Sequence, residues 1–130
     1  MYILVVEDDP LIREAIRDML TLEGYPVRTA THGREALDVI AQGAKPSLIL
    51  LDLMMPVVDG WQLMELLAED SELKGIPIVV ISAVGEVGHF KNQQNAIELV
   101  QKPFNLAHLL TIVNRHMNKG ELCQTGFHLG

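Results

Sequence analysis

Side chains that can take part in chemistry follow four short apolar segments of this 130-residue chain. Three consecutive carboxylates, residues 7–9, come after the first segment, and Asp52 comes after the third. Ser82 follows the fourth segment and Lys102 follows the fifth. Carboxylates bind hard metal ions, a hydroxyl donates a hydrogen bond, and an ammonium group neutralises a phosphate oxygen. Whether these groups act together depends on the elements that position them.

The apolar segments lack the alternation of a half-buried strand, so they are predicted to be strands buried on both faces. The five predicted strands are residues 2–6, 27–30, 48–51, 76–81 and 97–100. Helical periodicity separates them, at residues 10–23 and 33–42, from 60 or 61 to about 70, and from the predicted N-cap Asn105 to Met117. Residues 84–95 predict a short or frayed helix. Strands that alternate with helices predict a parallel sheet with helices on both faces.

The first helix has the clearest boundaries. Asp9 is a predicted N-cap, Pro10 occupies the first helical position, and Gly24 follows the last helical residue. Asp9 therefore has a structural role available to it that Glu7 and Asp8 lack.

The carboxyl ends of parallel strands meet at one edge of the sheet, where ligands of such folds bind. Two ionised carboxylates about 4 Å apart repel each other by roughly 4 kcal/mol at an effective dielectric constant near 20. A hard cation such as Mg²⁺ relieves that repulsion and keeps positions open for phosphate oxygens. With Lys102 and Ser82 at the same edge, the sequence predicts phosphoryl transfer to a carboxylate.

Each of these residues also has an ordinary structural explanation. Ser82 alone would be a loop serine, and Lys102 alone would be a surface lysine. The five histidines show no metal-ligand spacing and are predicted to lie at the surface. The functional interpretation therefore depends on the joint placement of several groups at strand ends.

Composition limits the classes of function. Hydrophobic residues make up 48% of the chain, charged residues 21%, and the formal net charge is −7. An acidic surface without a basic cluster repels nucleic acid. The single cysteine, Cys123, cannot form an internal disulfide, and no apolar stretch is long enough for a membrane span or a secretory signal. We expect a soluble cytoplasmic domain that binds neither nucleic acid nor membrane.

Four motifs, in their order and spacing, resemble the receiver domain of two-component response regulators. The motifs are ILVVEDDP at 3–10, LILLDLMMPVVDG at 48–60, IVVISA at 78–83 and QKPF at 101–104. The resemblance covers residues 1–118 and leaves 119–130 as an expected loosely ordered tail. It implies a flavodoxin-like (βα)₅ fold, a doubly wound sheet of five parallel strands in the order 2-1-3-4-5.

The resemblance assigns roles to individual residues. Asp52 would be the phosphoacceptor, Asp8 a direct Mg²⁺ ligand, and Glu7 a ligand beside it that acts through water. The backbone carbonyl of Met54 would complete the protein ligands, whereas Asp9 falls outside the matched acidic pair. The phosphoryl donor would be a phosphohistidine of a sensor histidine kinase or of a phosphotransfer protein.

The resemblance also assigns the positive and hydroxyl groups. Lys102 would pair with a phosphoryl oxygen, and the Lys102–Pro103 peptide bond is expected to be cis. The Ser82 hydroxyl would move to the phosphoryl group and switch the conformation of the domain. Pro56 and Gly60 fit the loop after the acceptor strand.

Two departures from the family pattern affect the output of the domain. Leu99 occupies a position that is often aromatic, and the segment 82–102 is slightly short. Both lie in the region formed by residues 84–95, the fifth strand and the last helix, through which a homodimer would form. Met54 and Val84 are apolar at positions that tune hydrolysis, so the resemblance implies slow autodephosphorylation.

Three alternatives stay open at this point. A phosphohydrolase of the haloacid-dehalogenase type also uses an aspartate nucleophile, but on its first strand and with a cap domain. A flavin mononucleotide binder of the same fold would need a glycine-rich phosphate loop where this chain has carboxylates. A degenerate receiver would serve only as an interaction module.

Overall fold

The computed structural model describes residues 2–52, 60–82 and 96–117. They form a sheet of five parallel strands in the order β2-β1-β3-β4-β5, as predicted. The strands are β1 (Ile3–Val6), β2 (Val27–Ala30), β3 (Leu48–Asp52), β4 (Ile78–Ser82) and β5 (Ala96–Gln101). The helices are α1 (Pro10–Leu22), α2 (Gly33–Ala41), α3 (Gly60–Glu69) and α5 (Leu106–Met117).

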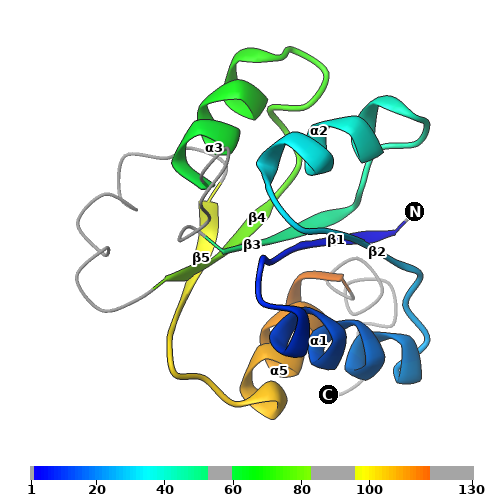
Figure 1. The fold of residues 1–130 in the computed structure, drawn as a ribbon, viewed down its shortest axis with the longest axis vertical. Coiled ribbons are helices and arrows are strands. Elements are labelled where there is room, and N and C mark those ends of the chain that lie inside the picture. Colours follow the sequence, from blue (N-terminus) through cyan, green and yellow to red (C-terminus); the bar gives the residue numbers. More distant parts are fainter. Residues whose placement is uncertain (1, 53–59, 83–95, 118–130) are drawn as a thin grey trace, which may run out of the picture.

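Helices cover both faces of the sheet, with α2 and α3 on one face and α1 and α5 on the other (Figure 1). Alternate strand residues enter two separate apolar clusters. Leu4, Ile49 and Val80 pack on the α2–α3 side, whereas Val5 and Leu50 pack on the α1–α5 side. The apolar segments are continuous because both faces of each central strand are buried, which is the prediction made from the sequence.

β1 differs from its predicted bounds by one residue at one end and β5 by one residue at each end, whereas the bounds of β3 and β4 differ in an informative way. β3 and β4 extend by one residue to include Asp52 and Ser82, because their pairing with neighbouring strands continues to Ile81 and Gln101. β4 begins later than predicted, since the backbone N–H of Ile76 donates to the Leu73 carbonyl and closes a turn instead. Asp52 and Ser82, the two candidate site residues, are therefore part of the sheet itself.

The first helix has the predicted caps. The Asp9 carboxylate accepts hydrogen bonds from the backbone N–H groups of Leu11 and Ile12. At the other end Gly24 has a φ of +94°, and the N–H of Tyr25 donates to the carbonyl of Leu20. This is the glycine-dependent termination expected of a Schellman motif. The ends of α1 are thus fixed by its own sequence.

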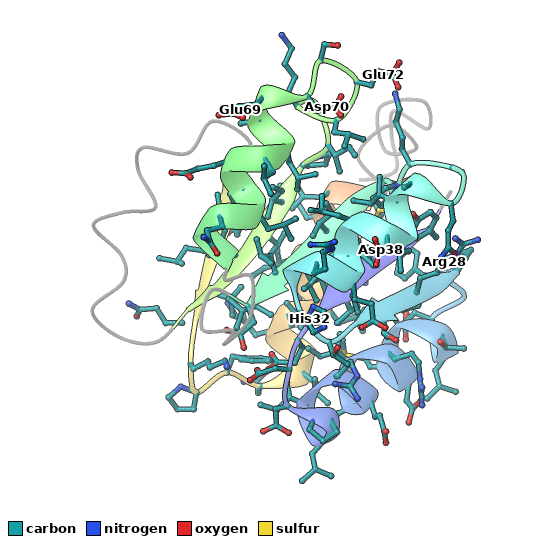
Figure 2. The ribbon with its side chains drawn as sticks, turned by 45° about the horizontal axis from the view of Figure 1, so that its top comes forward. Arg28, His32, Asp38, Glu69, Asp70 and Glu72 are labelled. Atoms are coloured by element: carbon teal, nitrogen blue, oxygen red, sulfur yellow. The ribbon has the colours of Figure 1, made fainter. Side chains whose placement is uncertain are left out.

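The second helix begins at Gly33 as predicted, but its cap was not foreseen. His32 lies where α2 begins (Figure 2), and its Nδ1 accepts a hydrogen bond from the N–H of Glu35. The Glu35 carboxylate in turn accepts from the backbone N–H and the hydroxyl of Thr31. The prediction that His32 is simply a surface residue is therefore incomplete.

The predicted helix at 84–95 and the predicted tail at 119–130 lie outside the described residues. Within the residues that are described, none of the helices has the length and apolar character needed to cross a bilayer.

Candidate functional site

The site lies at the carboxyl edge of the sheet, where β1 and β3 end side by side. Val6, the last residue of β1, pairs with Leu51, so Glu7 comes next to Asp52. The backbone N–H of Glu7 donates to the carbonyl of Ala30 at 3.0 Å, which ties the residue to β2 as well. Parallel pairing therefore brings together carboxylates that are 45 positions apart in the chain.

Three of the predicted acidic residues converge. One carboxylate oxygen from each of Glu7, Asp8 and Asp52 lies within 4.8 Å of the other two. Glu7 and Asp52 are almost completely buried, whereas Asp8 is exposed. Burying an ionised carboxylate costs several kcal/mol unless it is compensated. The cluster thus needs a positive partner.

Lys102 supplies part of that compensation. It follows β5, and its Nζ lies 3.1 Å from Asp52 Oδ2 and 4.0 Å from Glu7 Oε2. The Lys102–Pro103 bond is cis, as predicted. Burial acts to lower the pKa of Lys102, but the hydrogen bond and charge of Asp52, helped by Glu7 and Asp8, outweigh it and raise the pKa. The ammonium group therefore stays charged against the acidic cluster.

One ammonium group does not balance three carboxylates. Burial, reinforced by the adjacent Asp52 carboxyl, raises the pKa of Glu7 to about 8. Its Oε1 is buried and has no hydrogen-bond partner among the described residues. An oxygen in that condition is satisfied either by a proton or by a cation. Because carboxylate oxygens are the ligands that hard divalent cations prefer, the cluster could hold such a metal ion.

The backbone of the acidic segment, residues 7–9, is fixed by hydrogen bonds within the segment and from α1. The N–H of Asp9 donates to Glu7 Oε2 at 3.2 Å, and Asp9 itself caps α1 as predicted. The Arg13 guanidinium donates from Nη1 to the Glu7 carbonyl at 3.0 Å. Sequence reasoning missed Arg13. Its spacing of four residues after Asp9 is the only signal that could have placed it near this loop.

Several predicted site features are only partly described. Ser82 ends β4, next to the carboxyl end of β3, but its side chain is not among those described. Met54, Pro56 and Val84 lie outside the described residues, so the carbonyl ligand and the two positions that tune hydrolysis stay predictions. Leu99 is described, and it packs against the apolar cluster on the α2–α3 side.

Other acidic residues do not contribute to this site. Glu69, Asp70 and Glu72 lie together at the end of α3 and just after it (Figure 2). That end of the helix leads back to the start of β4, at the sheet edge opposite Asp52. Within the described part of the chain, Glu7, Asp8 and Asp52 are the one set of three such side chains close enough to share a metal ion.

The sequence matches a known family over most of its length. A sequence model of the family described as "Response regulator receiver domain" matches residues 3–114. The response regulator MprA of Mycolicibacterium vanbaalenii is 39% identical over 110 residues, which are 83% of this chain and 46% of that protein. The "DNA-binding dual master transcriptional regulator RpaA" of Synechocystis sp. is 33% identical over 114 residues, covering 85% and 46%. The chain spans less than half the length of these two relatives.

Solved structures show the same similarity. The receiver domain of a signal transduction histidine kinase from Syntrophus aciditrophicus superposes with a TM-score of 0.81 at 28% identity, covering 91% of this chain and 90% of that one. A response regulator receiver domain protein from Methanospirillum hungatei gives a TM-score of 0.78 at 28% identity, covering 90% and 94%. In these two cases the match takes in nearly the whole of the related chain.

Proposed function

This chain belongs to the response regulator receiver domains of two-component signalling, and we propose that Asp52 is the residue on which it accepts a phosphoryl group. The observation that carries the proposal is the position of the Asp52 carboxylate. It is buried at the end of β3, within reach of two further carboxylates and 3.1 Å from the Lys102 ammonium. A nucleophile, metal ligands and a neutralising cation are the parts that phosphoryl transfer requires.

In the proposed reaction, an Asp52 carboxylate oxygen attacks the phosphorus of a phosphohistidine on a partner protein. The new O–P bond forms as the N–P bond breaks, and the imidazole nitrogen leaves with the electron pair and takes a proton from solvent. Lys102 then pairs with a phosphoryl oxygen instead of with the unmodified Asp52 carboxylate. Asp52 would afterwards be restored when water attacks the phosphorus and inorganic phosphate leaves.

We propose Mg²⁺ as the ion that accompanies this reaction. Glu7, Asp8 and Asp52 would hold it, together with the carbonyl of Met54 that the family pattern adds. When bound, the ion supplies positive charge for the oxygens of the transferring group. The unpartnered Glu7 Oε1 supports a cation at this position. Convergence of the whole charged set favours a chemically active receiver over one that serves only as an interaction module.

The partner in this proposal is a sensor histidine kinase or a phosphotransfer protein. A groove beside the site is lined by apolar side chains of α1, of the segment between β5 and α5, and of the start of α5, including Leu11, Phe104 and Leu106. Lys102 lines the same groove and also contacts Asp52. A protein surface that presents a phosphohistidine to Asp52 would therefore cover Leu11, which is 80% exposed.

The remaining parts of the proposal concern output and turnover. Loss of phosphate would be slow, because Met54 and Val84 cannot orient a water molecule by hydrogen bonding. A homodimer would use the region around β5 and α5, where Glu98 binds Arg115 and His116 across the two elements. The net charge of −7 supports a domain that does not itself bind nucleic acid, and the family supports a cytoplasmic location.

Intact-mass measurement tests the acceptor. The protein is incubated with Mg²⁺ and acetyl phosphate, beside the Asp52→Asn variant and the matched control Asp38→Asn on the exposed side of α2. One phosphate adduct is expected on the wild type and on the control, and none on Asp52→Asn. An adduct of equal yield on Asp52→Asn would overturn the assignment.

A further inference from the structure

Arg13 is bonded to three successive carbonyl groups of the acidic segment. Its backbone N–H donates to the carbonyl of Asp9 at 2.9 Å, as the first turn of a helix requires. Its guanidinium Nη1 donates to the carbonyl of Glu7 at 3.0 Å and reaches the carbonyl of Asp8 at 3.5 Å, a longer and weaker contact. A single residue of α1 thus anchors the backbone carbonyls of residues 7, 8 and 9.

Among the described residues, the carbonyls of Glu7 and Asp8 accept no hydrogen bond from the backbone of the sheet or of α1. β1 ends at Val6, and beyond it the Glu7 N–H still donates to the Ala30 carbonyl on β2. α1 begins at Pro10, so its hydrogen bonds reach back only to Asp9. The guanidinium fills this gap with a charge-assisted donor, which is stronger than a neutral one.

Electrostatic repulsion acts on the same segment. The carboxylates of Glu7 and Asp8 repel each other and that of Asp52. If the carbonyls of residues 7 and 8 were not hydrogen-bonded, this short segment could rotate and move either carboxylate away from Asp52. The charge of Arg13 also acts on Glu35 in α2. The pKa of Glu35 is lowered mainly by hydrogen bonds from Thr31, with smaller contributions from the charges of His32 and Arg13.

We propose that Arg13 is a positioning residue for the metal site, holding the backbone of Glu7 and Asp8 so that both carboxylates face Asp52. This inference rests on the function proposed above. A positioning role and simple electrostatics predict opposite changes in Mg²⁺ affinity when the Arg13 guanidinium is removed. A guanidinium near a cation site opposes the cation, so removing it by charge alone would tighten Mg²⁺ binding. Removing a positioning residue weakens binding, by about 10-fold if it acts as other supports of metal ligands do.

Calorimetric titration with Mg²⁺ tests the inference on the full chain. Arg13→Gln is compared with the wild type, with Arg13→Lys, and with Arg17→Gln. Arg17 lies one turn further along α1 and pairs only with the exposed Asp18 among the described residues. We expect affinity to fall about 10-fold in Arg13→Gln, to fall less in Arg13→Lys, and to be unchanged in Arg17→Gln. Unchanged or tighter binding by Arg13→Gln would overturn the positioning role.

Amide hydrogen exchange without metal gives an independent measurement. In Arg13→Gln the Asp9 amide, which donates to Glu7 Oε2, should exchange faster, while the amide of Leu50 in the buried centre of β3 keeps its protection. Equal protection of Asp9 in the two proteins would contradict the inference, and loss of protection at Leu50 would show general unfolding and count against it too. If the wild type bound no Mg²⁺, the proposed function itself would fail, and this inference with it.

Discussion

The ammonium group of Lys102 lies 3.1 Å from the Asp52 carboxylate, although the two residues are 50 positions apart in the chain. The strand order explains the contact, because β3 and β5 flank β4 and end at the same sheet edge. Without phosphate, Lys102 compensates a buried carboxylate. In the proposed phosphorylated state, the same ammonium group would pair with a phosphoryl oxygen. One side chain would thus have an anionic partner in both states.

This relationship predicts opposite effects of Lys102→Met on two measurements. Mg²⁺ binding should tighten, because a positive charge is removed from beside the cation, while phosphorylation by acetyl phosphate should slow by about 100-fold, because the transferring charge loses a donor. Lys74→Met, a change of an exposed lysine after α3, is the control. A normal rate of phosphorylation in Lys102→Met would show that the ammonium group does not act in the transfer.

The proposed metal site predicts that Mg²⁺ stabilises the folded domain, since the carboxylates that would bind the ion converge only after folding. At a concentration 100 times the Kd, the gain is about 2.7 kcal/mol. Asp8→Asn should reduce the increase in melting temperature that Mg²⁺ causes. Because Asp8 is exposed, the substitution should not disturb the packing of the core. Asp18→Asn on α1 serves as the matched control and should keep the full increase. An equal increase in Asp8→Asn would remove Asp8 from the ligand set.

The site could be predicted from the sequence where it depends on local signals and on topology. Asp52 and Lys102 were placed together because parallel strands end at one edge, and Asp9 and Gly24 were placed because helix caps have strong residue preferences. The strand order and the cis bond before Pro103 came from the family resemblance, and both are confirmed.

What the sequence did not predict depends on side-chain packing between separate elements. Arg13 reaches backwards to the Glu7 carbonyl, and His32 caps α2 although histidine is an uncommon N-cap residue. Tyr25 bonds to Asn114, 89 positions away, which no local pattern indicates. Such contacts depend on the angles at which helices pack on the sheet, and those angles are set by the whole core.

The raised pKa of Glu7 predicts a pH dependence of stability in the absence of metal. In the unfolded chain this carboxyl ionises near 4.5, whereas in the folded domain its pKa is about 8. Between these values the folded state binds more protons, so the free energy of unfolding should fall as the pH rises from about 5 to 8. Urea unfolding in the presence of a chelator measures this trend.

Glu7→Gln provides the corresponding control experiment. The amide cannot ionise, so the decline in stability between about pH 5 and 8 should become shallower, and the variant should be more stable than the wild type at the alkaline end. Glu14→Gln, an exposed change on α1, should leave the decline as it is. Parallel pH curves for the wild type and Glu7→Gln would mean that Glu7 is ionised in the folded domain throughout this range.

The apolar groove beside the site predicts a difference between two kinds of phosphodonor. Leu11 is 80% exposed at the start of α1 and lines the groove, whereas Leu22 is 86% exposed at the far end of the same helix. Burying a leucine side chain contributes about 1.5–3 kcal/mol, so Leu11→Gln should lower kcat/KM for transfer from a phosphohistidine protein by about 10-fold or more. Leu22→Gln should not.

Acetyl phosphate separates binding of the partner from the chemistry at Asp52. Because this donor is too small to cover the groove, Leu11→Gln should react with it at the rate of the wild type. An equal loss with both donors would show that the substitution disturbs the acidic cluster, since Asp8 lies only three residues before Leu11. No loss with either donor would mean that the partner approaches Asp52 from another side. Only a loss confined to the phosphohistidine protein supports the groove as the surface over which the partner lies.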